Sequence, residues 1–219
     1  MTANSRSVIS NQLGIHPKLG AVVNKHLKTA NTAPLQLHNI TAFNTLRKQL
    51  AEKSLPLILD SFCGTGHSTA ALAEQHGDHF VVGIDQSASR LNRHPGDSDN
   101  YLLLQANCEA IWAQLVKHEV LAAAHYMLYP NPWPKAAHLQ RRIHGHPGFA
   151  DLVRLGGAIE LRSNWQLYVE EFGIAMLQAG TYGYVSRLPE KETGISLFER
   201  KYHASGQSLW VYRTAALKK

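Results

Sequence analysis

Residues 55–213 alternate between short apolar segments and segments with helical periodicity, and this alternation limits the possible folds more than any other feature of the sequence. Short apolar runs bounded by turn signals are typical of buried strands. They predict strands over residues 55–60, 80–85, 101–105, 124–129, 157–162, 182–187 and 208–213. The intervening periodicity predicts helices over residues 67–76, 87–93, 107–118 and 165–178. Strands that alternate with helices predict an α/β fold with a doubly wound, mostly parallel sheet.

The chain is predicted to have two parts. Residues 1–53 are predicted to form a basic, helical N-terminal extension, interrupted by Pro17 and Pro34. The extension ends with an amphipathic stretch over residues 41–53. Residues 54–219 are predicted to form the α/β domain, and their number suffices for a single domain with its own core.

The composition argues against a membrane protein and against a secreted one. No segment reaches the ~18 uninterrupted apolar residues that a membrane span needs, and the polar start lacks the pattern of a secretory signal. The two cysteines, Cys63 and Cys108, lie in different predicted elements, so a disulfide framework is not expected. These features predict a cytoplasmic protein, which we expect to act as a monomer or a homodimer.

The net charge of +6 is distributed unevenly along the chain. Residues 1–53 hold seven Lys or Arg against one acid, residues 55–131 hold three against eight, and residues 132–219 hold twelve against seven. An acidic centre with basic flanks suits a domain that holds a small ligand centrally and meets a polyanion at its edges. Ordinary solvated lysines explain the same counts.

A glycine-containing loop follows the first predicted strand, where a doubly wound sheet binds its ligands. It reads Asp60-Ser61-Phe62-Cys63-Gly64-Thr65-Gly66-His67. Any tight strand-to-helix turn uses such glycines, so the loop alone leaves a structural role equally open. The second predicted strand ends in Asp85, some twenty residues further on. An acid at that tip is placed to accept hydrogen bonds from the ribose hydroxyls of a nucleoside.

The spacing D-x-x-x-G-x-G differs from the G-x-G-x-x-G phosphate cradle that dinucleotides require. It resembles the S-adenosylmethionine site of Rossmann-like methyltransferases, whose cofactor carries an ammonium group that suits Asp60. Phe62 departs from this pattern because it stands where the first glycine is usual. Asn107, after the third strand, is placed to read the adenine edge or to cap the next helix, and both roles are compatible.

The most specific stretch is Tyr129-Pro130-Asn131-Pro132-Trp133-Pro134-Lys135, which follows the fourth predicted strand. Its three prolines predict a rigid, extended loop. Trp133 offers a stacking face for a base. Phosphate contacts are expected from Lys135, Arg141 and Arg142. Histidines at 138, 144 and 146 match no zinc signature, so we expect no metal.

Three motifs, in order, resemble those of the tRNA guanine-N(7)-methyltransferase family over roughly residues 55–213. That family has PDPW-x-K-x-x-H-x-x-RR, where this chain has Pro130-Asn131-Pro132-Trp133-Pro134-Lys135, then His138 and Arg141-Arg142. It has T-D-W-x-x-Y, where this chain has Ser163-Asn164-Trp165-Gln166-Leu167-Tyr168. It has T-x-F-E-R, where this chain has Ser196-Leu197-Phe198-Glu199-Arg200.

The resemblance implies a class I methyltransferase that uses S-adenosylmethionine to form 7-methylguanine at guanine 46, in the variable loop of tRNA. It implies catalytic or base-positioning roles for Asn131 and Glu199. The cofactor residues that it implies are Asp60, Phe62, Gly64, Gly66, Asp85 and Asn107. The substrate residues are Trp133, Lys135, His138, Arg141, Arg142, Asn164 and Ser196.

The departures from the family pattern share a direction. Asn107, Asn131 and Asn164 stand where the family has aspartates, and Ser196 stands where it has threonine. Methyl transfer to N7 of guanine needs no general base, because that nitrogen carries a free lone pair. Alignment of the reactants supplies ~7–11 kcal/mol, so the Asn substitutions are expected to lower the rate without abolishing the reaction.

Two alternative functions remain open. Asn131-Pro132-Trp133 loosely resembles the N-P-P-[FYW] motif of amino-group methyltransferases, but has one proline where they have two. The other alternative is an RNA-binding or cofactor-binding homologue with altered or lost activity, which the Asn substitutions and Phe62 support.

Overall fold

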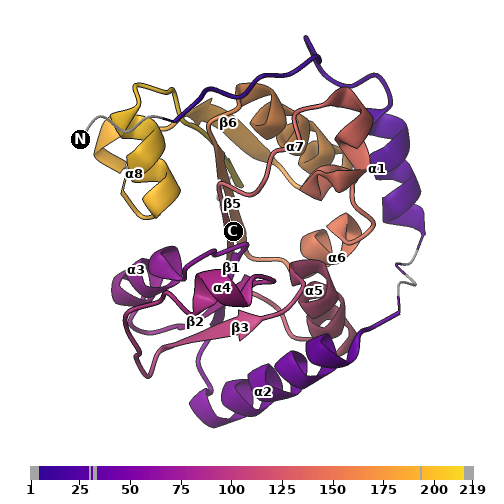
Figure 1. Cartoon of the computed structure of the whole chain (residues 1–219). Helices are drawn as coiled ribbons and strands as arrows, with labels where there is room; N and C mark the ends of the chain where they lie inside the picture. The colour runs from indigo at the N-terminus through magenta and orange to yellow at the C-terminus, as the bar shows by residue number, and fades with distance from the viewer. Residues whose placement is uncertain (1–4, 30, 32–33, 193, 215–219) are drawn as a thin grey trace.

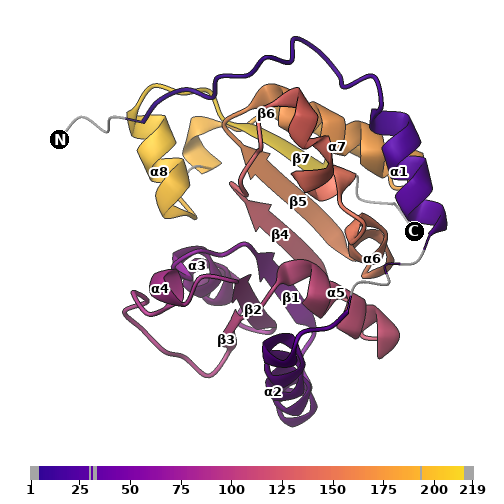
Figure 2. The ribbon, with the colours of Figure 1, turned by 45° about the vertical axis from the view of Figure 1, so that its right-hand side comes forward.

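The structure of the protein is a computed structural model that describes residues 5–29, 31, 34–192 and 194–214. Seven strands form a sheet in the order β3-β2-β1-β4-β5-β7-β6 (Figures 1 and 2). The pairs among β1 to β5 are parallel, and β7 is antiparallel to both β5 and β6. The predicted doubly wound, mostly parallel sheet is confirmed. The strands are β1 (Leu57–Ser61), β2 (Phe80–Asp85), β3 (Tyr101–Gln105), β4 (Ala124–Leu128), β5 (Ala158–Ser163), β6 (Gly183–Arg187) and β7 (Trp210–Thr214).

The central strand β1 is buried along its whole length, because helices cover both faces of the sheet. Successive side chains of a strand point to opposite faces. Accordingly, Leu57 and Leu59 join the largest apolar cluster, whereas Ile58 joins a smaller one on the other side. This explains why the strands read as continuous apolar runs rather than as alternating ones.

The larger cluster receives side chains from five helices, and the smaller one from α3. The five are α1 (Leu19–Lys28), α2 (Leu37–Lys53), α5 (Cys108–Lys117), α6 (Phe149–Arg154) and α7 (Gln166–Gln178). The remaining α-helices are α3 (His67–Gln75), α4 (Ala88–Leu91) and α8 (Leu197–Ala204), and the 3-10 segments are η1 (Ala136–Arg141), η2 (Ile143–Gly145) and η3 (Glu190–Glu192). No helix in the described part of the chain is long and apolar enough to cross a bilayer.

The predicted helices over 67–76, 107–118 and 165–178 are present within one residue at each end. The amphipathic stretch predicted from Thr41 begins earlier, at Leu37, as α2. Sequence periodicity missed α6 and α8 as helices, because six and eight residues are too few to establish a helical period.

The segment before α1 has no regular structure and crosses one side of the molecule. Residues 5–18, which we call the N-terminal strap, run from the neighbourhood of α8 to α1 (Figures 1 and 2). The following helix anchors it, because Leu19 and Val23 are fully buried in the main core. The strap therefore lies between two well-packed parts of the fold.

Candidate functional site

A cavity of about 650 Å³ lies beyond the carboxyl ends of the parallel strands. In the strand order, β1 has β2 on one side and β4 on the other. The loops that follow such neighbours diverge and leave a crevice. The cavity is lined by seven of the residues singled out from the sequence, namely Phe62, Asp85, Asn107, Asn131, Trp133, Arg141 and Asn164.

Asp85 organises the cofactor loop from the end of β2. Its Oδ2 accepts a hydrogen bond from the amide of Gly64 at 3.0 Å, and its Oδ1 accepts one from the amide of Ser87 at 2.8 Å. Arg90 Nη1 lies 3.7 Å from Oδ2. Each carboxylate oxygen has two acceptor positions. Asp85 therefore holds the loop and retains capacity for ligand hydroxyls in the cavity.

The glycine loop requires left-handed backbone at three positions. Gly64 and Gly66 have φ values of +62° and +74°. A Cβ at Gly66 would lie 2.6 Å from Leu103, so no other residue fits there without displacement. Phe62 also has a positive φ, +65°, which is costly for a bulky residue. Its ring meets the Trp112 ring edge-on at 5.9 Å and lines the cavity without filling it.

Asp60 is buried under this loop. Its Oδ2 accepts hydrogen bonds from the hydroxyls of Ser68 and Thr69, each at 2.7 Å. Its Oδ1 has no hydrogen-bond partner among the described residues. Burial raises the pKa of Asp60 to about 6, although the two hydroxyls act in the opposite direction. A buried oxygen without a partner fits a site that is completed by a cation.

Asn107 precedes the first residue of α5, at the cap position, but its side chain does not cap the helix. Its Oδ1 lies 3.2 Å from Nε2 of His38, and its amide donates to Oδ1 of Asn39 at 2.9 Å. Both partners come from the start of α2, and Asn39 is buried. The expected side-chain cap is therefore wrong. α2 instead positions a cavity residue, a role that the sequence did not reveal.

The proline loop after β4 is sharply bent. Tyr129 and Trp133 have φ values of +58° and +47°. Asn131 is exposed at the cavity, and its Oδ1 accepts a hydrogen bond from the Trp133 amide at 3.3 Å. Since proline fixes φ at three neighbouring positions, the tip holds Asn131 toward the cavity.

The indole of Trp133 is only partly free for stacking. The Arg141 guanidinium carbon lies 4.9 Å from its ring centroid, and the His138 ring meets it edge-on at 5.6 Å. His138 and the exposed Lys135 do not line the cavity, unlike Arg141.

Asn164, just after β5, also lines the cavity, and its Nδ2 donates to Oε1 of Gln207 at 2.8 Å.

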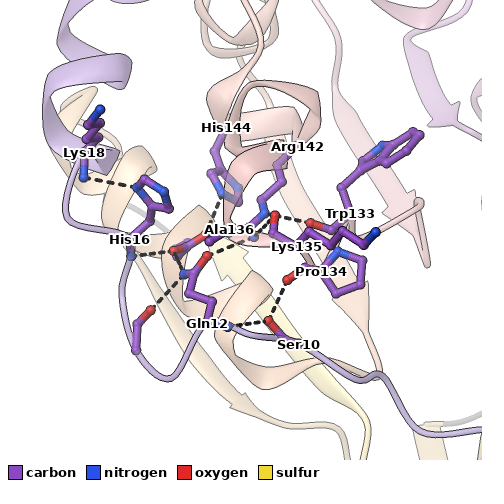
Figure 3. Close-up of polar contacts among 12 residues, drawn as sticks. Ser10, Gln12, His16, Lys18, Trp133, Pro134, Lys135, Ala136, Arg142 and His144 are labelled. Atoms are coloured by element: carbon purple, nitrogen blue, oxygen red, sulfur yellow. Dashed lines mark hydrogen bonds and ion pairs between the residues drawn. The ribbon is translucent and has the colours of Figure 1, made fainter.

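Arg142 does not have the exposure that a phosphate contact needs. Its side chain is fully buried and forms an ion pair with Glu171 of α7. It also donates to the carbonyl of Trp133 at 3.2 Å (Figure 3). The guanidinium carbon lies 4.9 Å from the centroid of the Trp165 ring. The expected contact between Arg142 and phosphate is therefore wrong, because this guanidinium holds the proline loop from inside the protein.

Glu171 shares this buried network with His144. Burial alone raises the pKa of Glu171, but His144, the His16 amide and Arg142 outweigh it and lower the pKa to about 2. Glu171 is therefore a carboxylate at neutral pH. Among the described residues, no three His, Cys, Asp or Glu side chains are arranged to hold a metal ion.

Glu199 is fully buried and does not face the cavity. Its Oε1 accepts from Tyr129 Oη at 3.0 Å and from Arg162 Nη1 at 2.7 Å. Its Oε2 accepts from the amides of Gly194 and Ile195 at 2.7 and 2.9 Å. With four donors, this carboxylate has no acceptor position left for a base. The expected direct contact of Glu199 with substrate is therefore wrong.

Ser196 likewise has a structural role in place of the expected substrate contact. It is buried, and its Oγ caps α8 by accepting from the Glu199 amide at 3.1 Å. The aromatic side chains of Tyr129, Phe198 and Tyr202 line the cavity beside this helix. Tyr129 was not predicted as a cavity residue. Its position in the sequence, between the end of a buried strand and the proline loop, is the signal that could have identified it.

A family model with the description "Putative methyltransferase" matches residues 54–211. The chain belongs to this methyltransferase family. A tRNA (guanine-N(7)-)-methyltransferase of Nocardioides sp. (strain ATCC BAA-499 / JS614) is 36% identical over 172 residues. The match covers 72% of this chain and 66% of that protein, so the chain spans slightly less than two thirds of that relative's length.

Solved structures share the fold of this methyltransferase. "Structure of an Antibiotic Related Methyltransferase" aligns with a TM-score of 0.57 at 15% identity, covering 88% of this chain and 98% of the other. A 16S rRNA (adenine(1408)-N(1))-methyltransferase from Catenulisporales acidiphilia, solved with cosubstrate SAM, gives 0.55 at 14% identity, with coverages of 79% and 92%. At these identities the likeness shows the fold alone.

The family indicates S-adenosylmethionine as the cofactor of this methyltransferase, and the residues present fit it. Asp85 lies in the cavity with free acceptor capacity for ribose hydroxyls, and Asn107 offers an amide at the next strand end. Asp60 is fully buried and does not line the cavity, but its unpartnered oxygen, just beneath the loop, suits the cofactor's ammonium group. Gly66 allows the tight turn that brings the loop backbone to this edge of the sheet.

Cofactor affinity is expected to fall as the pH drops below about 6. The free protein binds a proton at Asp60 with a pKa of about 6, and a cation near this carboxylate lowers that pKa. Binding then releases a proton, and the affinity decreases by up to about ten-fold per pH unit below 6. Calorimetry at pH 5 and pH 7, in buffers of different ionisation enthalpy, measures both effects. Asp60→Asn should remove the proton release; an unchanged release would assign it to another group.

Proposed function

We propose that this methyltransferase transfers the methyl group of S-adenosylmethionine to N7 of guanine in tRNA, at position 46 of the variable loop. The proposal is carried by one observation: the Asp85-centred loop and the tip bearing Asn131 and Trp133 line the same cavity. Three sequence motifs and the similarity to the Nocardioides enzyme support the choice of substrate.

The proposed chemistry places modest demands on the protein. The cofactor supplies an electrophilic methyl group. The residues of the cavity hold the purine close to it and in line, which is the main source of acceleration for such a displacement. Asn131 accepts a hydrogen bond from a guanine N–H through its amide oxygen. Because Glu199 is engaged elsewhere, Asn131 has no carboxylate from α8 to assist it.

RNA binding is proposed to use the exposed cations beside the cavity. Lys135 and Arg141 are exposed, and His138, which lies between them in the sequence, packs against Trp133. Cations on such a surface neutralise phosphates and release counterions. Residues 1–53, which precede the proposed catalytic region at 54–219 and pack into its core through α1 and α2, add a net positive charge. A cytoplasmic location and a monomeric or homodimeric state complete the proposal.

The test is radiolabelled methyl transfer to unmodified tRNA, followed by identification of the product nucleoside. The expected product is 7-methylguanosine, lost when guanine 46 of the tRNA is changed to adenine. Recovery of a methylated exocyclic amino group would instead support the amino-group methyltransferase alternative. Cofactor binding without transfer to any RNA would support a homologue that has lost activity.

Asn131→Ala is expected to lower turnover by about ten-fold, the equivalent of one hydrogen bond of ~1.4 kcal/mol. Cofactor affinity should change little, because Asn131 lies on the substrate side of the proposed site. Single-turnover kinetics and calorimetry separate the two quantities. Asn131→Asp, which restores the carboxylate of the family motif, serves as the matched variant and should keep or raise turnover. An equal loss of turnover and cofactor affinity in Asn131→Ala would contradict the assigned role.

A further inference from the structure

The N-terminal strap is hydrogen-bonded to the backbone of the proline loop. Ser10 Oγ donates to the carbonyl of Pro134 at 2.5 Å (Figure 3). Oδ1 of Asn11 accepts from the amide of Ala136 at 3.0 Å. These contacts join segments more than 120 residues apart in sequence. The strap therefore touches the loop on which Asn131 and Trp133 lie.

Gln12 joins the strap to the buried ion pair beneath that loop. Its Oε1 accepts from Arg142 Nη2 at 3.0 Å, and its Nε2 donates to Oε1 of Glu171 at 2.6 Å (Figure 3). The His16 amide donates to the same Glu171 oxygen at 2.7 Å. A buried ion pair is stable only when its remaining donors and acceptors are satisfied. The strap supplies three of these hydrogen bonds, two from Gln12 and one from the His16 amide, so its position and the state of the pair are linked.

The ion pair is in turn connected to the loop. Arg142 donates to the carbonyls of Trp133 and Lys135, at 3.2 and 3.4 Å. A chain of hydrogen bonds thus runs from Gln12 through Arg142 to the two residues that flank Pro134. At the start of the strap, the carbonyl of Ser5 accepts a hydrogen bond from Nε2 of Gln207 at 2.9 Å. The same glutamine accepts a hydrogen bond from the cavity residue Asn164.

The strap is held by polar contacts rather than by apolar burial. Its large apolar side chains point to solvent: Ile9 is 85% exposed, Leu13 102% and Ile15 42%. A segment with few buried apolar contacts belongs to the least stable parts of a fold. Its attachment therefore depends on a few side chains, of which Gln12 bridges both buried charges.

We propose that the N-terminal strap fixes the conformation of the proline loop, and that Gln12 is a positioning residue for the reaction through Arg142 and Glu171. An amide suits this place because it offers a donor to the carboxylate and an acceptor to the guanidinium at once. The Gln12→Glu side chain has the same shape but lacks the N–H donor, so its carboxylate faces the carboxylate of Glu171 and the two repel each other. The expected effect of Gln12→Glu on turnover rests on the proposed function, whereas its expected effect on the conformation of the loop does not.

The structural test is hydrogen exchange of the full-length protein, comparing the wild type with Gln12→Glu and with Leu13→Ala. Leu13 is the matched control, since it is the next residue and makes no buried contact. Loss of the bridge is expected to speed exchange of the Ala136 amide by about ten-fold, while Leu13→Ala exchanges like the wild type. Gln12→Ala is the second variant if Gln12→Glu does not fold.

The kinetic test separates positioning from stability. Gln12→Glu is expected to lower kcat for RNA methylation by about ten-fold, with the dissociation constant of S-adenosylmethionine unchanged. Exchange rates equal to those of the control overturn the proposal. Faster exchange with unchanged kcat also overturns it, because the strap then affects the proline loop without affecting the reaction. If the wild type methylates no tRNA, the proposed function fails, and the exchange comparison still decides whether the strap sets the loop.

Discussion

Asp85→Ala is expected to weaken the binding of S-adenosylmethionine by about 100-fold, the equivalent of ~2.7 kcal/mol. The change removes the acceptor for the Gly64 amide of the cofactor loop and for the Ser87 amide just after β2, and it leaves the bond from the Cys63 amide to the Ile84 carbonyl in place. It also removes the charged acceptor available to ribose hydroxyls, and hydrogen bonds to charged groups contribute about 1.5–3 kcal/mol each. Calorimetric titration of the purified variant measures the loss.

A matched control shows whether the loss of affinity is specific to Asp85 or follows from the removal of any acid. Asp97 is an exposed acid that does not line the cavity, and Asp97→Ala should bind the cofactor like the wild type. Thermal unfolding of Asp85→Ala shows whether the fold is retained. An affinity within about three-fold of the wild type, less than one ordinary hydrogen bond contributes, would remove Asp85 from the proposed cofactor site.

The second large effect distinguishes two adjacent arginines. Arg142→Ala is expected to lower the free energy of unfolding by about 3–5 kcal/mol, because it leaves the buried carboxylate of Glu171 without its ion-pair partner. For a chain of this length that corresponds to a fall in Tm of roughly 6–20 °C. Differential scanning calorimetry measures the shift.

Arg141→Ala is the matched control for Arg142→Ala. Arg141 is exposed and stacks on Trp133, so its removal should change the unfolding free energy by less than about 0.5 kcal/mol. It should instead weaken RNA binding and flatten the salt dependence of that binding. Equal stability losses in the two variants would contradict the distinction between a buried and a surface arginine.

The sheet and the core of the site could be predicted from the sequence because both depend on local patterns. Apolar runs of five or six residues identified the strands, and ligand sites in such sheets gather at the carboxyl ends of the strands. Asp85 ends β2, and Asn107, Asn131 and Asn164 closely follow β3, β4 and β5 in the sequence. They line one cavity for that reason.

The errors occur where long-range packing decides the role of a residue. Arg141 and Arg142 are identical in type and adjacent in sequence, yet one is exposed and the other fully buried, because α7 places Glu171 behind only the second. Glu199 is turned inward by Arg162 of β5, a partner 37 residues away. No local pattern reports such pairs, and the same holds for Gln12.

The contact between α2 and Asn107 has a consequence for how this enzyme is divided. The family region begins at residue 54, yet Asn39 and His38, which lie before it, hold the backbone and the side chain of a cavity residue. A protein that began at residue 54 would keep every strand of the sheet, but it would lose the residues that hold Asn107 at the cavity. Residues ahead of the matched family region therefore help to shape the cavity, although they do not line it.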